Sequence, residues 1–103
     1  MSERSGGEKN IEEYLYQEYD GMMNEVVFKL VELAAANVSV NLTDKEIRRI
    51  KELNSRRSNI LEVQHAAKSK STEEKIKSYQ EIIPMLKELL DDMKKFEAKI
   101  LPR

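Results

Sequence analysis

The chain has 103 residues, of which 36% are charged and 40% apolar, and its net charge is only −1 at pH 7. This length suits one domain with one modest core. Frequent Glu, Lys, Leu and Ile, with only 3 Gly and 2 Pro, favour helices over strand-rich folds, which need more turn residues. Because cysteine is absent, disulfides, thiol nucleophiles and thiolate metal sites are excluded.

The N-terminal sequence MSERSGGEKN is polar, and no apolar segment of a signal peptide follows it. No apolar run approaches the length of a membrane helix. We therefore expect a cytoplasmic or nuclear protein that is not secreted and has no membrane span. Residues 1–10 are expected to form a flexible polar tail and residues 11–103 a single helical domain.

Apolar residues at every third or fourth position predict a first helix over residues 11–36. They are Ile11, Leu15, Tyr19, Met22, Val26, Leu30 and Leu33. Asp20 and Gly21 form a turn-like pair inside this stretch, and an interior Gly costs about 1 kcal/mol relative to Ala. A bend or a break of the helix at Gly21 therefore stays open.

Residues 37–42 are predicted to connect the first helix to the second. The triplets that begin at Asn37 and Asn41 fit the N-glycosylation pattern, but that modification requires a secretory compartment. Thr43 and Glu46 have the spacing of a capping box, in which each side chain accepts a hydrogen bond from the other residue's backbone N–H. We favour the capping box, which predicts a second helix over residues 44–68.

Ser71 and Glu74 repeat the capping-box spacing and predict a third helix over residues 73–101, which Pro102 ends. Heptad positions a and d of this helix are apolar except for Glu97. They are occupied by Ile76, Tyr79, Ile83, Leu86, Leu90, Met93, Glu97 and Ile100, with Ile82, Leu89 and Phe96 at g. This wide apolar face favours contact with two neighbouring helices over a two-stranded seam.

Pro84 lies outside the apolar stripe of the third helix, where it removes a hydrogen bond to the Gln80 carbonyl. A kink at Pro84 is expected, and two shorter helices meeting at Ile83 are the alternative. Three helices of similar length with short connections predict an all-α, antiparallel three-helix bundle. An extended helical hairpin or coiled coil that completes its bundle with another chain buries the same faces and stays open.

His65 is the only histidine, and Glu62 precedes it by three positions, as in carboxylate-bridged di-iron bundles. Such sites need a second Glu-x-x-His on another helix, and the chain has no second histidine. It also lacks a glycine-rich phosphate loop and a serine or threonine with a partnered base. We therefore expect no enzyme, no catalytic residue, no cofactor and no metal site.

Charge is unevenly distributed along the chain. Residues 1–43 hold 3 basic and 8 acidic side chains, and residues 44–70 hold 8 basic and 4 acidic ones. Helical spacing gathers Lys45, Arg48, Arg49 and Arg56 on one side of the second helix, where they are candidate contacts for nucleic-acid phosphates. The alternative is that the basic second helix attracts the acidic first helix while the stripe is solvated.

Arg57 falls inside the apolar arc of the second helix, where an unpaired cation is costly. We hypothesise that it pairs with Glu25 or Glu18 of the first helix, or with an acid of a partner chain, and so contributes to partner choice. The alternative is a buried side-chain stem with the guanidinium group in water.

Tyr14, Tyr16, Met22 and Met23 are further candidate partner contacts, because tyrosine and methionine are enriched at protein interfaces. The alternative is that they pack at the rim of the bundle. We expect a non-enzymatic protein–protein interaction module, a small adaptor or structural subunit of a larger assembly, or a homo-oligomer, that uses its helical faces. A nucleic-acid-binding helical domain using the basic stripe is the alternative.

Overall fold

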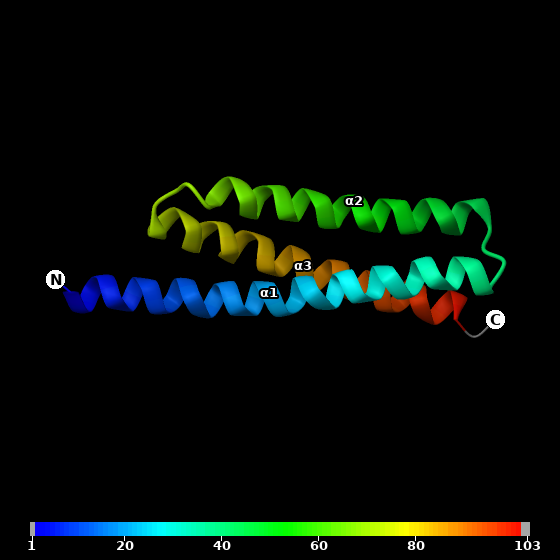
Figure 1. Ribbon diagram of the computed structural model, residues 1–103, viewed down its shortest axis with the longest axis horizontal. Coiled ribbons are helices and arrows are strands. Elements are labelled where there is room, and N and C mark those ends of the chain that lie inside the picture. The colour runs from blue at the N-terminus through cyan, green and yellow to red at the C-terminus, as the bar shows by residue number, and fades with distance from the viewer. Residues whose placement is uncertain (1, 102–103) are drawn as a thin grey trace.

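The computed structural model describes the backbone of residues 2–101 and the side chains of residues 10–101. Across this range the chain forms three α-helices, α1 (Ser2–Ser39), α2 (Asp44–Ala67) and α3 (Thr72–Ile100). Figure 1 shows α1 and α3 running in one direction and α2 in the other, within an elongated bundle of 59 × 21 × 17 Å. The predicted antiparallel three-helix bundle is confirmed.

The first helix is longer than the sequence pattern predicts at both ends, because it continues to Ser39 and so includes residues 37–39 of the predicted connection. α1 begins at Ser2, so the predicted start at Ile11 is too late, and the stretch expected to be a flexible tail is helical from Ser2 onward. This stretch contains no proline, and extending an existing helix is much easier than nucleating one. As a result, the N-terminal end of α1 projects past the connection between α2 and α3 (Figure 1).

α1 continues through Asp20 and Gly21 without a break. Gly21 does not have a positive φ angle, so the helix does not use the conformational freedom of glycine there. The neighbouring turns on both sides are held by the buried side chains of Tyr19 and Met23. Tertiary packing therefore outweighs the local preference of this pair for a turn.

Gly21→Ala is expected to stabilise the protein by about 1 kcal/mol, because alanine loses less conformational freedom in a helix. A Cβ atom added at Gly21 meets no atom within 4 Å, so the methyl group fits without any rearrangement. Urea unfolding followed by helical circular dichroism measures the change. A destabilised variant would mean that position 21 is not in a regular, solvent-facing helical turn.

The predicted capping box at the start of α2 is confirmed. The backbone N–H of Thr43 donates to Glu46 Oε1 at 2.9 Å, and the backbone N–H of Glu46 donates to Thr43 Oγ1 at 3.1 Å. At the start of α3, Ser71 Oγ accepts from the backbone N–H of Glu74 at 3.3 Å, which forms one half of the second predicted box. Both helices therefore begin where the sequence places them, to within one residue.

α3 is one helix from Thr72 to Ile100, so the alternative of two helices meeting at Ile83 is wrong. Pro84 is exposed on the outer side of α3, where its ring does not disturb the core. On either side of it, Ile83 and Leu86 are buried. Packing of the turns before and after Pro84 maintains the helix despite the missing hydrogen bond.

The core follows α3, which packs against both α1 and α2, whereas α1 and α2 contact each other less extensively. The most deeply buried side chains are Val26, Leu33, Leu53, Ile60, Ile82, Leu86, Leu89, Met93 and Ile100. Glu97, the polar exception among the heptad positions, receives two hydrogen bonds from Lys29 Nζ at 3.0 and 3.2 Å. This hydrogen bond to Glu97 raises the pKa of Lys29.

Candidate functional site

The outward side of the C-terminal half of α1 is apolar, whereas a helix side that faces water is normally polar. Some of its exposed residues are three or four positions apart and form a row along the helix, and the others lie directly beside this row, so that together they form one strip. We call this strip the α1 face; it comprises Val27, Phe28, Val31, Ala34, Ala35 and Val38. Phe28 is 64% exposed and Val31 is 61% exposed. Contiguous apolar surface of this kind is typical of an interaction site.

The α1 face continues into an open groove between α1 and α2. We call it the α1–α2 groove; it is lined by Val27, Leu30, Val31 and Ala34 of α1 and by Ile50, Lys51, Asn54 and Arg57 of α2. The α1 wall is entirely apolar, whereas the α2 wall combines one apolar side chain with an amide and two cations. Such a groove can accept the apolar side of an amphipathic helix. Its polar and cationic wall can then discriminate between helices by the charge of the residues beside their apolar side.

Arg57 does not pair with the described side chains of α1, residues 10–39. It is half-buried, and its Nε donates to Asn54 Oδ1 at 3.2 Å. The two expected partners, Glu18 and Glu25, form ion pairs with lysines of α3 at 3.7 and 4.0 Å. The hypothesis of an Arg57–glutamate pair between α1 and α2 is therefore wrong. Among residues 10–101, the hydrogen-bond partner of the Arg57 side chain is a neutral amide.

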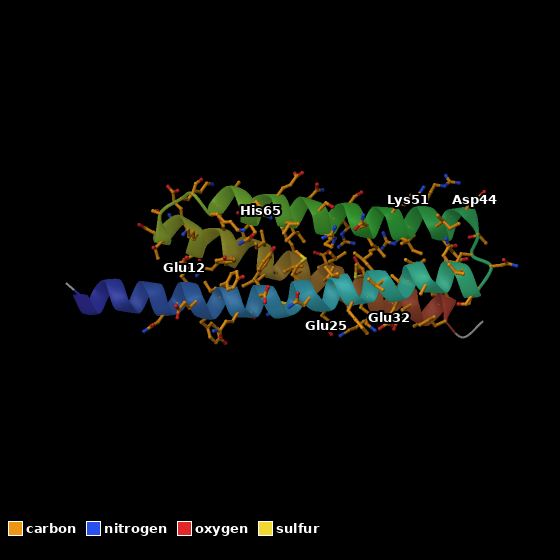
Figure 2. All side chains as sticks on the ribbon, viewed as in Figure 1. Glu12, Glu25, Glu32, Asp44, Lys51 and His65 are labelled. Atoms are coloured by element: carbon orange, nitrogen blue, oxygen red, sulfur yellow. The ribbon has the colours of Figure 1, made fainter. Side chains whose placement is uncertain are left out.

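The acidic side of α1 faces α3. In addition to those two ion pairs, Glu12 Oε1 lies 3.6 Å from Lys75 Nζ of α3. Figure 2 shows Glu25 and Glu32 on the side of α1 away from α2. Among residues 10–101, these acids of α1 therefore form their ion pairs between helices with lysines of α3, and the alternative in which the acidic first helix attracts the basic second helix gains no ion pair from them.

The tyrosines and methionines predicted to contact a partner lie N-terminal to the α1 face and differ in exposure. Tyr14 is 68% exposed. Tyr16 is less exposed and packs edge-on against Tyr79, with ring centroids 6.3 Å apart. Met22 is half-buried against the core, and Met23 is only 7% exposed within it. Met23 is therefore not available to a partner, because the buried arc of α1 is wide enough to contact two helices.

Half of the predicted basic stripe forms ion pairs with carboxylates of the same chain. Arg56 Nη1 donates to Asp92 Oδ2 of α3 at 2.8 Å, and this hydrogen bond lowers the pKa of Asp92. Arg49 Nη1 donates to Glu52 Oε1 at 2.6 Å on the same helix. Arg56 therefore joins α2 to α3, and the charge of Arg49 is partly neutralised.

Lys45 and Arg48, the other half of the stripe, are exposed and form no ion pair with residues 10–101. They lie at the edge of a cleft between the start of α2 and the end of α3. We call it the basic cleft; it is lined by Lys45, Glu46, Arg48, Arg49, Glu52, Phe96 and Lys99. The cleft combines cations with an aromatic side chain. The exposed part of the basic stripe therefore lies at a defined cleft and not on a flat surface.

A small polar cluster lies inside the N-terminal half of the bundle. Tyr19 is 3% exposed, its ring centroid lies 5.7 Å from that of Tyr79, and its hydroxyl has no hydrogen-bond partner among residues 10–101. Burial, and then the neighbouring Tyr79, raises the pKa of Tyr19 to about 12. Gln64 is also buried and donates to the Tyr79 hydroxyl at 3.4 Å. The Tyr19 hydroxyl therefore loses its hydration without gaining a partner.

His65 is exposed on α2. Within residues 10–101, no three side chains of histidine, aspartate or glutamate lie close enough together to hold a metal ion. Over the described part of the chain, none of the helices has both the length and the apolar composition needed to cross a membrane.

Sequence reasoning missed the α1 face because it matched a single apolar stripe along the first helix. The signal was present in the segment VVFKLVELAAANVSV, where Val27, Val31 and Val38 form a second row beside the core row, roughly a third of a turn around the helix. A helix that is apolar on two sides is typical of one with a neighbour on each side. A scan against protein-family models, a search of curated proteins and a search of solved structures each found no match to this chain.

Proposed function

We propose that this chain is a non-enzymatic protein–protein interaction module that binds an amphipathic helix of another protein. The bound helix lies along the α1 face with its apolar side in the α1–α2 groove. The observation that carries the proposal is the exposed apolar strip of α1 that lies beside its buried side and borders the α1–α2 groove. A chain with this property suits the role of a small adaptor or structural subunit in a larger helical assembly.

The geometry of the groove supports a helix as the bound element. The α1 face extends from Val27 to Val38, which is about 17 Å of helix at ~1.5 Å per residue. An amphipathic helix of three or more turns covers this length with apolar residues at every third or fourth position. Such a helix would bury the side chains of α1 and α2 that line the open groove between them.

Site-specific photo-crosslinking tests the proposal. A photoreactive amino acid replaces Val31 in the α1 face, or replaces the exposed Glu62 of α2 as a matched control, in the full chain expressed in its source cells. We expect position 31, and not position 62, to crosslink to a defined segment of one protein whose apolar residues have helical spacing. Equal, diffuse crosslinking at both positions would contradict the proposal.

A charge introduced into the α1 face provides a second test of the proposed function. Val31→Glu is expected to abolish the crosslink from a probe at Phe28 while changing the stability of the isolated chain by no more than about 0.5 kcal/mol, because Val31 is exposed. Thermal unfolding followed by circular dichroism provides the stability control. A crosslink that survives Val31→Glu would place the partner elsewhere.

The basic cleft favours a second candidate function, in which the chain contacts a nucleic-acid backbone. Lys45, Arg48 and Lys99 are the three cations of the cleft that form no ion pair among residues 10–101. Three phosphate contacts predict that the logarithm of the binding constant falls with that of the salt concentration with a slope of about −3. Arg48→Ala should reduce this slope by about one. No detectable binding to duplex or single-stranded nucleic acid at low salt would remove this candidate.

A further inference from the structure

Resting on the proposed function, we infer that the helix received by the α1–α2 groove is acidic: it places a carboxylate opposite Arg57 on the flank that faces α2. The partner is therefore an amphipathic helix of defined charge and not an apolar helix of any kind. The inference concerns the recognition of the partner, whereas the proposed function requires only that a helix binds.

The environment of Arg57 carries the inference. Its side chain is half-buried in the wall of the groove and bonds to the neutral Asn54 amide, while the nearby acids of α1 are paired with α3. A helix that fills the groove removes water from the guanidinium group. Leaving a cation desolvated without a counter-charge is strongly unfavourable. A carboxylate on the bound helix solves this problem, since its two oxygens match the paired N–H groups of arginine.

Lys51, at the outer edge of the same wall, also favours a negatively charged partner helix. It lines the groove, is exposed, and forms no ion pair with residues 10–101. Lys51 and Arg57 are six positions apart on α2, which corresponds to about 9 Å along the helix. A partner helix with two acids six or seven positions apart, beside its apolar stripe, would face both cations.

A second copy of this chain fits the groove less well. Its own apolar strip is again the α1 face, and the nearest acids, Glu25 and Glu32, project from the side of α1 away from α2 (Figure 2). Both also lie within 4.0 Å of a lysine of their own chain. Two copies joined through their α1 faces would bring Arg57 of each into the interface without an acid to meet it.

Two synthetic helical peptides test the inference on the full chain. They share one leucine stripe and differ only in the flanking positions, which are glutamate in one peptide and lysine in the other. We expect the wild-type chain to bind the glutamate peptide at least about tenfold more tightly, because the lysine peptide opposes two cations. Arg57→Glu should reverse the preference, as measured by calorimetric titration or fluorescence anisotropy.

Arg48→Glu is the matched control, because it makes the same charge change at an exposed position of α2 outside the α1–α2 groove. It should leave the preference unchanged. If Arg57→Glu fails to fold by circular dichroism, Arg57→Gln, which keeps a polar side chain without the charge, should abolish the preference without reversing it.

The outcomes separate the inference from the proposed function. Equal binding of both peptides, unaffected by Arg57→Glu but lost with Val31→Glu, would overturn the acidic-helix inference and leave the proposed function standing. Binding of neither peptide, together with no specific crosslink at position 31, would overturn both. A chain that forms a dimer by sedimentation equilibrium, and becomes monomeric with Val31→Glu, would show that a second copy occupies the groove and would overturn the inference.

Discussion

Leu86→Ala is expected to destabilise the protein by about 3–5 kcal/mol, which is a large part of the total stability of a domain of this size. Leu86 has no exposed surface and lies on the side of α3 that contacts the core, close to the middle of the bundle. Truncation removes apolar contacts and leaves a cavity that rigid neighbouring helices cannot close. Urea unfolding of both forms by circular dichroism measures the difference in the free energy of unfolding.

Met85→Ala is the matched control for Leu86→Ala, because Met85 is the adjacent residue of the same helix and is exposed. This variant should lose no more than about 1 kcal/mol. Similar losses for the two variants would mean that α3 does not bury its apolar stripe within the single chain. That result would favour the alternative in which another chain completes the core.

Tyr19→Phe is expected to stabilise the protein by about 1–2 kcal/mol at neutral pH, although it deletes a polar group. The hydroxyl of Tyr19 is buried without a hydrogen-bond partner among residues 10–101, so the folded state loses its hydration without compensation. Phenylalanine keeps the ring contact with Tyr79 and removes this cost. A destabilised variant would show that the hydroxyl does have a partner, such as a buried water molecule.

The same residue predicts a difference between wild type and Tyr19→Phe at high pH. The pKa of Tyr19 is raised from 10.0 to about 12, so the folded state holds this proton more tightly than the unfolded state does. The corresponding stability is fully present below pH 10 and is lost as the pH rises through about 12. Over that window the wild type should lose about 2 kcal/mol more than Tyr19→Phe. Because lysines also titrate there, the difference between the two proteins is the informative quantity.

The sequence pattern was sufficient for the positions of α2 and α3. Capping residues and a heptad of apolar side chains placed both ends of each helix within one residue of Asp44–Ala67 and Thr72–Ile100. The start of α1 is not predicted because residues 2–10 are polar and have no apolar periodicity. The helix predicted to begin at Ile11 nevertheless propagates back through them. Packing along α1 likewise outweighed the turn preference of Asp20 and Gly21.

The candidate site was only partly predictable. Arg57 was identified from its place in an apolar arc, but its pairing with α1 was not correct. Periodicity shows which side of each helix is apolar, yet it does not show on which side of α1 each neighbouring helix lies. In the structure α3 takes the acidic side of α1, so Glu18 and Glu25 form ion pairs with lysines, and Arg57 meets no carboxylate among residues 10–101.

The ion pair between Lys29 and Glu97 has a consequence for how the helices align along the bundle axis. The apolar heptads of α3 repeat, so a shift of seven residues relative to α1 would still bring many apolar side chains into contact. That shift would separate Glu97 from Lys29 and place a carboxylate against an apolar neighbour, with a desolvation penalty. A single charged pair at the C-terminal end of α3 therefore distinguishes the native register from slipped bundles that apolar packing alone would tolerate.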